Sequence, residues 1–402
     1  MGTYTTGTKL YKPANGESGW DDEANTNFDR LSEFGINVKS YGAVGDGITN
    51  DTAAIQAAID AASDGDVLFF PRGHWVFSTL SITKSLTFAG VGFWNNANVA
   101  FGNAAWAGSQ YGTNFGGTVL RSTNTASRAI LAATSGKRLN VQDLMLLGPG
   151  SGTSNGFELG TAAIPQDGMD WSNVLVANFG GAGYRMLFCV SNAFHDLKAR
   201  GCKSGLSLSD TTNENHFFRT EVQFSDTDAV LLTTDTQLNM FNGGLIQNCT
   251  GDGFDVSGVG NHLRGFYFEN SGITKAAKFV GGGDHSLTHS YMSTADEDID
   301  INVPYCTVGP LRHGVGGYII TLGTAADIQL IYPSGATIVD NGNFYTGPTG
   351  RAKTQVVATA SLPAANAAWN GFVLIEDAGA GDRNLIIYAG AQRFRIDGGA
   401  AF

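Results

Sequence analysis

Two glutamates in the middle of the chain have the residue type and the spacing that cleavage of a glycosidic bond requires. Glu221 lies six residues after Asn215 and Glu269 lies eight residues after Asn261, in segments that alternate apolar and polar residues. If these segments stack as coils, standard strand spacings place the two Cα atoms about 11–12 Å apart. Carboxyl groups that lean together would then be about 6.5–9.5 Å apart, which leaves room for the water of an inverting hydrolase. The spacing therefore predicts Glu221 and Glu269 as acid and base.

Aromatic and basic residues on the same predicted face could hold a sugar. Tyr267 and Tyr291 would be stacked neighbours, and their flat rings suit the apolar face of a sugar ring. Arg219, Arg264 and His289 could bind an anionic sugar, or neutralise a uronate while a base removes its C5 proton. The sequence thus predicts a polysaccharide site and leaves both hydrolysis and elimination open.

Some of these charges also have a purely structural interpretation. Asp196 completes the set of candidate catalytic carboxylates, but it would lie beside Arg219 on the adjacent coil. Lys198 would lie beside Glu221 in the same way. Opposite charges on neighbouring strands commonly form ordinary cross-strand pairs. A register slip of one residue would also exchange the inward and outward faces.

Residues that could hold a metal ion give a weaker signal. The acidic run Asp296–Asp298 with Asp300 offers carboxylates of the kind that Ca²⁺ prefers, although a solvated acidic turn is the simpler interpretation. No Cys-x-x-Cys motif occurs, so we predict no zinc site. The four cysteines are expected to be buried free thiols: Cys189, Cys202, Cys249 and Cys306. We therefore predict no cofactor, with calcium as the alternative.

Composition and charge argue against several kinds of partner. The 402 residues carry a net charge of −12 without a basic stripe, which is unlike a nucleic-acid-binding surface. No apolar run reaches the length of about 18 residues that a membrane-spanning helix needs. Residues 1–30 also lack the apolar stretch of a signal peptide. We expect no membrane insertion, and exit from the cell by a route other than a cleaved leader.

The elements that would position the candidate residues recur along the chain. An asparagine returns at spacings of 23, 24 and 22 residues, each time followed by an alternating segment: Asn192, Asn215, Asn239 and Asn261. A second signal in each unit is a small residue followed by apolar, any, apolar, as in Gly253-Phe-Asp-Val256. Short alternating segments at such a period are typical of a chain that coils strand upon strand. Because one coil cannot bury its inward face alone, the stack itself would form the core.

Stacking the coils on the asparagines predicts three columns of outward side chains. The first contains Lys198, Glu221, Leu245, Tyr267 and Tyr291. The second contains Arg200, Gln223, Gln247, Glu269 and Ser293. The third contains Asp196, Arg219, Gly243, Gly265 and His289.

Composition divides the chain into three predicted parts. Residues 1–35 form a polar head, residues 36–323 contain the coils, and residues 324–402 form a small β tip. In the tip, three apolar segments separated by Gly turns predict a meander: Gly371–Ile375, Asn384–Tyr388 and Gln392–Ile396. So short a meander is expected to pack on copies of itself. Ahead of the coils, Asp51 is predicted to cap a helix over Thr52–Ala62.

The stretch from Asn37 to Gly92 resembles the opening module of the pectate-lyase-like superfamily. The matching residues are the loop Tyr41-Gly-Ala-Val-Gly-Asp-Gly47, the run Asn50-Asp51-Thr52, the Ala-rich helix, and Phe70-Pro71-Arg72-Gly73. The resemblance implies an all-β chain whose body is a right-handed parallel β-helix, a single-stranded solenoid. It says little about chemistry, because the superfamily includes lyases, glycoside hydrolases and inactive members.

The whole layout resembles a bacteriophage tailspike or tail fibre, and the head segment from Lys12 to Leu31 is similar to the leader of many such chains. This resemblance implies a parallel homotrimer in the virion tail, attached through the head to a tail or baseplate protein. It implies a bacterial surface polysaccharide (capsule, exopolysaccharide or O-antigen) as the ligand. The predicted activity is depolymerisation by a glycoside hydrolase. The alternatives are a non-catalytic receptor-binding fibre, a lyase acting by β-elimination, and a free bacterial enzyme of the superfamily.

Overall fold

The structure is a computed structural model of the chain. It describes residues 35–93, 116–132, 136–161, 165–269, 273–293, 298–314, 319–323 and 329–330 with their side chains. It describes the backbone alone at residues 3–4, 11–12, 94–95, 115, 318, 336–340, 355–358, 373–379, 382–389 and 392–397. Most of the predicted head therefore lies outside the described residues.

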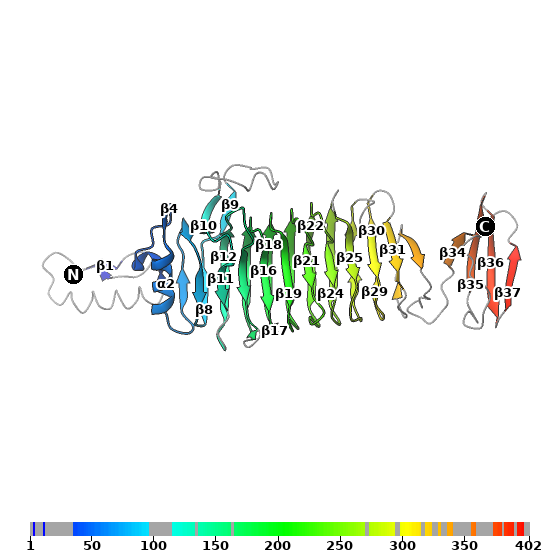
Figure 1. Cartoon of the computed structure of the whole chain (residues 1–402), viewed down its shortest axis with the longest axis horizontal. Helices are drawn as coiled ribbons and strands as arrows, with labels where there is room; N and C mark the ends of the chain where they lie inside the picture. The colour runs from blue at the N-terminus through cyan, green and yellow to red at the C-terminus, as the bar shows by residue number, and fades with distance from the viewer. Residues whose placement is uncertain are drawn as a thin grey trace.

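Two long sheets form the body of the molecule, and their strands follow one another along the long axis (Figure 1). The first sheet contains β3 (Ile36–Asn37), β4 (Asp46–Asn50), β5 (Val67–Phe69), β6 (Gly73–Phe77), β8 (Leu86–Ala89), β9 (Phe93–Asn95), β10 (Phe115–Ser122), β12 (Leu139–Leu147), β15 (Asp170–Ala177), β18 (Ala193–Arg200), β20 (His216–Gln223), β22 (Met240–Gln247), β24 (His262–Glu269), β26 (Ser286–Thr288), β27 (Tyr291–Met292), β29 (Thr307–Val308), β30 (Arg312–His313) and β32 (Gln329–Leu330). The second sheet contains β7 (Leu80–Ile82), β11 (Arg128–Ala132), β13 (Asn155–Leu159), β16 (Ala182–Leu187), β19 (Ser204–Ser209), β21 (Val230–Leu232), β23 (Phe254–Val256), β25 (Lys275–Phe279), β28 (Asp298–Ile301), β31 (Tyr318–Leu322) and β33 (Ala336–Asp340).

The coils contribute strands to both sheets, and apart from the antiparallel pair of β9 with β10 these strands pair in parallel with the equivalent strands of the next coil. In the first sheet, for example, β20 pairs with β22 and β22 pairs with β24 without a register shift. In the second sheet the same order runs without interruption from β7 to β33, past residue 323 where the sequence suggested a boundary. A chain that winds in this way is a parallel β-solenoid, as the repeat predicted.

A ladder of buried asparagines fixes the register of the coils. The side-chain Nδ2 of each asparagine donates to Oδ1 of the next, over 2.8, 2.9 and 3.0 Å: Asn192 to Asn215, Asn215 to Asn239, and Asn239 to Asn261. The same Oδ1 atoms also accept from the backbone N–H of the preceding asparagine. His285 ends the ladder, because its Nδ1 accepts from the backbone N–H of Asn261 at 3.2 Å. Burial lowers the pKa of His285, which keeps that nitrogen free to accept.

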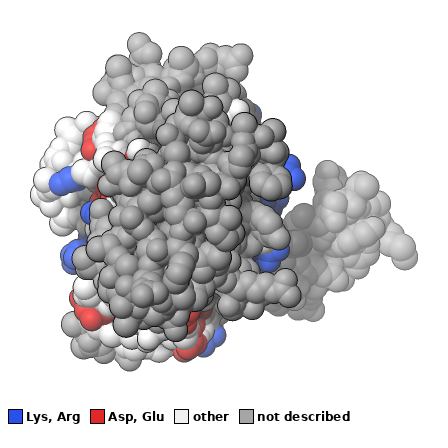
Figure 2. Space-filling view, turned by 90° about the vertical axis from the view of Figure 1, so that its right-hand side faces the viewer, with Lys and Arg blue, Asp and Glu red and all other residues white. Residues whose placement is uncertain are grey.

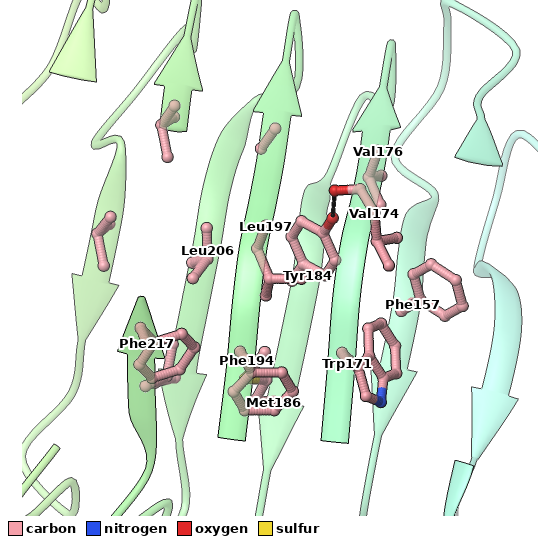
Figure 3. Close-up of a cluster of buried hydrophobic side chains, with 14 of the residues drawn as sticks. Phe157, Trp171, Val174, Val176, Tyr184, Met186, Phe194, Leu197, Leu206 and Phe217 are labelled. Carbon is pink, nitrogen blue, oxygen red and sulfur yellow. Dashed lines mark hydrogen bonds between the residues drawn. The ribbon is translucent and has the colours of Figure 1, made fainter. Parts of the chain in front are cut away.

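Aromatic rings fill the interior beside this ladder (Figure 3). Phe217 lies between Phe194 and Phe241 at centroid distances of 4.9 and 4.3 Å, so equivalent rings of three coils form one stack. The hydroxyl of Tyr184 is buried with them and donates to backbone oxygens at Val174 and Lys198, 2.9 and 3.1 Å away. Equivalent positions of neighbouring coils thus stack on each other within one close-packed interior.

The N-terminal end of the stack is closed by α2 (Thr52–Ala61), which follows the short helix η1 (Val38–Tyr41). Gln56 on α2 donates to the backbone oxygen of Ser81 and accepts from its N–H, both at 3.1 Å, and so covers part of the first strand of the second sheet. The helix begins where predicted, but the proposed capping role of Asp51 is wrong. Its buried carboxylate accepts instead from the N–H groups of Val44 and Gly45, and so it fixes the Gly-rich loop.

The C-terminal segment forms a separate four-stranded sheet in the order β34 (Gln355–Ala358), β35 (Val373–Gly379), β36 (Asp382–Ala389) and β37 (Gln392–Asp397). The last three strands pair antiparallel, which confirms the predicted meander. β34 adds to it in parallel and was not predicted. Two further two-stranded pairs are β1 (Thr3–Tyr4) with β2 (Tyr11–Lys12) and β14 (Gln166–Asp167) with β17 (Cys189–Val190). Among the described residues, no helix is long and apolar enough to cross a membrane.

All four cysteines are buried free thiols, as predicted. Burial raises the pKa of Cys202 and of Cys306 to about 12, and it also raises the pKa of Cys189 and Cys249. Because the thiolate is the reactive form, we expect the native protein to be inert to Ellman's reagent at pH 8. Four thiols should be titrated once the protein is unfolded in guanidinium. Rapid reaction of even one thiol in the native state would contradict this burial.

Candidate functional site

The strand pairing confirms the predicted order of the first outward column. Lys198 pairs with Glu221, Glu221 with Leu245, Leu245 with Tyr267, and Tyr267 with Tyr291. The next pair in the same line is Tyr291 with Arg312, a residue that the sequence did not single out. We call these six residues the tyrosine column. Side chains that are distant along the chain thus become neighbours on one outer face.

The two tyrosines form the flat part of this column. Their ring centroids are 5.2 Å apart and the ring planes differ by 17°, which is a stacked arrangement. Tyr267 is 39% exposed, so its ring is open to solvent at the surface. An exposed aromatic pair of this kind presents a large apolar face that can pack against the C–H groups of a sugar ring.

Glu221 lies on this face, but its two carboxylate oxygens already have cationic partners. Nζ of Lys198 is 3.5 Å from Oε1, and Nη2 of Arg200 is 3.6 Å from Oε2. Burial lowers the pKa of Arg200, and Glu221 opposes that shift. The cross-strand pair of Lys198 with Glu221 is therefore confirmed, whereas the catalytic role of Glu221 stays a prediction.

Glu269 lies two residues beyond Tyr267 on β24 and so faces the same side of the strand. It ends a second column, in which the pairs are Arg200 with Gln223, Gln223 with Gln247, and Gln247 with Glu269. Nε2 of Gln247 donates to Oε2 of Glu269 at 2.9 Å, and Nε2 of Gln223 donates to Gln247. Glu221 and Glu269 thus share one face, two coils apart, and both are partly exposed.

The third column is a corner at which every long strand bends. Its residues have left-handed backbone dihedral angles, with φ of 54° at Asp196, 56° at Arg219, 75° at Gly243, 73° at Gly265 and 54° at His289. The inside–outside alternation shifts by one residue here, so that the two halves of each strand face different directions. The sequence did not predict this bend, although the two glycines are residues that favour such a conformation.

The bend separates several predicted site residues. Arg264 precedes the corner, whereas Tyr267 follows it, so the two lie on different halves of β24. Arg219 and His289 lie on the corner itself. Asp196 forms an ion pair with Arg219 through Oδ2 and Nη2, which confirms the structural interpretation of that pair. The structure therefore places only Tyr267, Tyr291 and the two glutamates on one half-strand face.

A second group of carboxylates lies on the outside of the second sheet and was missed by the sequence reasoning. Asp228 Oδ1 accepts from the backbone N–H of Asp252 at 2.9 Å, so the two residues are neighbours. Nζ of Lys278 lies 3.7 Å from Asp252 and 3.3 Å from Asp255. Burial raises the pKa of the Asp252 carboxyl, and the charge of Asp228 raises it further. A carboxyl group whose pKa is raised beside a second carboxyl group resembles the arrangement of an acid–base pair.

A signal for this group was present in the sequence. Asp228 and Asp252 each stand directly before the small residue of the second repeat signal, Ala229 and Gly253. Two aspartates at the same position of consecutive coils must become neighbours once the coils stack. The columns of the second sheet were not part of the prediction.

The described residues contain no group of three or more His, Cys, Asp or Glu side chains that could hold a metal ion. Part of the acidic run Asp296–Asp298 lies outside the described residues. Asp298 and Asp300 both pair with Nζ of Lys275, at 3.4 and 3.5 Å. A view along the long axis shows charged side chains of both signs around the visible rim (Figure 2).

The two sheets and their outward columns define a parallel β-solenoid of pectate-lyase-like type. The chain belongs to the family described as rhamnogalacturonase A/epimerase, pectate lyase-like, whose model matches residues 35–255. The predicted fold family is thereby confirmed. The handedness of the coil and the trimeric assembly stay predictions.

Phage proteins are among the relatives. Depolymerase 1 (capsule KN3-specific) of Klebsiella phage KN3-1 is 25% identical over 211 residues, which cover 46% of this chain and 24% of that protein. The pre-neck appendage protein of Bacillus phage B103 is 39% identical over 74 residues, which cover 18% of this chain and 8% of that protein. This chain thus matches only a minor part of the length of these relatives.

Among solved structures, ORF18 of Geobacillus virus E2 aligns over 98% of this chain and 74% of its own, with a TM-score of 0.45 and 14% identity. Other matches include mannuronan C5-epimerases of Azotobacter vinelandii and a surface adhesin of Streptococcus pneumoniae. The similar proteins therefore include both enzymes and an adhesin.

Proposed function

We propose that this protein binds a bacterial surface polysaccharide and cleaves its glycosidic bonds as part of a phage tail. The observation that carries the proposal is the exposed stack of Tyr267 and Tyr291, with Glu269 beside it on the same face. Arg312 continues the column and would attract an anionic substituent of the sugar chain. The match to a phage protein described as a capsule-specific depolymerase supports this substrate class and a location in the virion.

Each predicted residue has a role in this proposal. Tyr267 and Tyr291 pack against sugar rings, and Glu221 and Glu269 act as acid and base across the bond between them. At the corner, Arg219 and His289 would meet charged parts of a longer chain, while Asp196 orients Arg219. Arg264 would act on the other side of the corner.

The pair Asp228 and Asp252 is the second candidate for the catalytic carboxylates. The raised pKa of Asp252 favours it, because a general acid must hold its proton near the working pH. The turn of residues 248–251 separates Gln247 from Asp252, so a polysaccharide crossing the edge of the first sheet would approach this pair next.

We also propose how three copies of the chain assemble and attach to the phage tail. Residues 1–35 would attach the protein to a tail or baseplate protein. The solenoid, which continues past residue 323 to β33, would be right-handed, and the C-terminal four-stranded sheet would join three parallel copies. Light scattering in solution should then give the mass of three chains. A monomeric mass for the full chain would contradict the trimer.

The proposed function is tested by incubating the purified protein with a panel of bacterial capsular polysaccharides. Hydrolysis should create new reducing ends without the ultraviolet absorbance of an unsaturated uronate. Tyr267→Ala should weaken polysaccharide binding about tenfold, because it removes one stacked ring. Tyr41→Ala is the matched control, since Tyr41 is 38% exposed but lies at the other end of the solenoid.

The possible outcomes separate the rival functions. Retained binding without new reducing ends would favour a non-catalytic receptor-binding fibre, and unsaturated products would favour a lyase. Absence of the polypeptide from virions would favour a free bacterial enzyme. If Tyr267→Ala and Tyr41→Ala bind as the unmodified protein does, the tyrosine column is not the substrate site.

A further inference from the structure

We propose that a groove on the other half of the bent strands is a second carbohydrate site, which takes a neutral sugar chain. The groove has a volume of about 690 Å³, within the range of about 300–1,000 Å³ that is usual for ligand sites. Residues of four successive coils line it, among them Asp170, Ser191, Glu214, His216, Phe218 and Leu238. It lies before the corner column, whereas the tyrosine column lies after it, so the two sites face different directions.

The floor of the groove is partly aromatic, because His216 and Phe218 line it. His195 is not a lining residue, but it stacks on Phe218 with a centroid distance of 4.8 Å and an angle of 6° between the rings. His216 lies on the other side of Phe218, at 6.2 Å and 47°. Met240 adds apolar surface and is 36% exposed. Such a floor can pack against the C–H face of a pyranose, as the tyrosine pair can.

One wall of the groove consists of side chains from strained turns. Ser191, Glu214 and Leu238 directly precede successive ladder asparagines and have left-handed φ angles of 56°, 57° and 54°. The equivalent positions on the two flanking coils are the glycines Gly168 and Gly260. A leucine in this conformation is unfavourable, and strain of this kind is often retained where a side chain has a function. The wall therefore spans the three coils of Ser191, Glu214 and Leu238, whereas Gly168 leaves the fourth coil of the groove without a wall side chain.

The polar groups of the groove favour a neutral ligand. Asp170 and Glu214 supply carboxylate oxygens that can accept from sugar hydroxyls, and Oγ of Ser191 already donates to Glu214 at 3.1 Å. His195 Nε2 lies 4.0 Å from Asp170 Oδ1, so the stacked ring is also near a carboxylate. The described residues that line the groove include no lysine or arginine. A uronate or phosphate would meet like charge here, whereas hydroxyl groups would find acceptors.

The test uses saturation-transfer NMR of the full chain with maltohexaose, laminarihexaose, mannohexaose and hexagalacturonate as probes. We expect at least one neutral hexasaccharide to bind and hexagalacturonate to be excluded from the groove. Phe218→Ala should weaken that binding about tenfold, because it removes half of the ring stack. Leu238→Gly should also weaken it, and glycine is well suited to φ of 54°, so this variant keeps the fold.

Tyr267→Ala is the control, because it changes the tyrosine column and leaves the groove intact. Failure of all three neutral probes to bind would overturn the proposal, as would equal binding by the unmodified protein, Phe218→Ala and Leu238→Gly. Loss of neutral-sugar binding in Tyr267→Ala alone would overturn the groove and leave the proposed function standing. Loss of neutral-sugar binding in Phe218→Ala and Leu238→Gly, with binding retained in Tyr267→Ala, would support the groove. This result does not depend on whether the tyrosine column binds the polysaccharide.

Discussion

Replacing Asn215 with alanine should lower the free energy of unfolding by about 3–5 kcal/mol, because buried donors that lose their acceptor each cost about 1–3 kcal/mol. The side chain of Asn215 accepts from both the backbone N–H and Nδ2 of Asn192, at 3.2 and 2.8 Å. It also donates to the backbone oxygen of Cys189 and to Oδ1 of Asn239, at 2.8 and 2.9 Å. All of these groups are buried, so water cannot replace the lost partner. Urea denaturation followed by tryptophan fluorescence would measure the change.

Asn242→Ala is the matched control for this prediction. Asn242 lies on the same sheet one coil further along, but its side chain is on the partly exposed outer surface. Surface substitutions of this kind usually change stability by about 0.5 kcal/mol or less. If the two variants unfold at the same urea concentration, the ladder does not carry the stability that its hydrogen bonds suggest.

Glu269→Gln should reduce turnover of the polysaccharide by about 10²–10⁴-fold while binding stays unchanged, because a general acid–base group typically contributes that much. The amide keeps an oxygen that can accept from Gln247, so the local structure is retained. Glu221→Gln should have a similar effect if the two residues act as a pair. Initial rates of reducing-end formation, together with the affinity of the variant for intact polysaccharide, would separate turnover from binding.

Asp252→Asn decides between the two carboxylate pairs. If it abolishes turnover while Glu269→Gln remains active, the acid–base pair is Asp228 and Asp252. The pH dependence of turnover would then give a second test of this assignment. The pKa of Asp252 is raised, so a general acid at this position would lose activity as the pH rises through that raised value. Asp255→Asn is a suitable control, because Asp255 contacts the same lysine from the neighbouring strand position.

The register of the first sheet could be predicted because a buried asparagine needs hydrogen-bond partners for both its carbonyl oxygen and its amide nitrogen. Each ladder position needs a side chain that both accepts and donates, and an asparagine recurs once in each coil, at spacings of 23, 24 and 22 residues, so that successive side chains meet. The spacing of Asn215, Asn239 and Asn261 therefore predicted the pairing of Glu221 with Leu245 and of Leu245 with Tyr267.

The bend of the strands could not be read from the same pattern. Two of the corner positions are glycines, but Asp196, Arg219 and His289 adopt the left-handed conformation without being residues that require it. Glycine, aspartate and histidine are all enriched in this conformation, so local preference gave only a partial signal, which Arg219 interrupts. Because the alternation shifts there, Arg264 was predicted on the wrong half of the strand relative to Tyr267.

The helix before the coils shows another limit of sequence patterns. An aspartate ahead of an alanine-rich run predicts a cap, and α2 does begin after Asp51. The carboxylate is nevertheless used by Val44 and Gly45, which the fold brings to it. Long-range hydrogen-bond partners can compete with local ones for the same side chain, and the sequence alone does not show which partner the side chain will bind.

The asparagine ladder also limits how the length of the solenoid can change. From Asn192 to Asn261 each coil contacts the next through its asparagine, and Phe194, Phe217 and Phe241 stack in the same order. A duplication or loss of one whole repeat would lengthen or shorten the rod by about 4.8 Å without altering its cross-section. The length of the solenoid can therefore match a thicker or thinner glycan layer in steps of one coil, while the face that we propose binds the glycan stays unchanged.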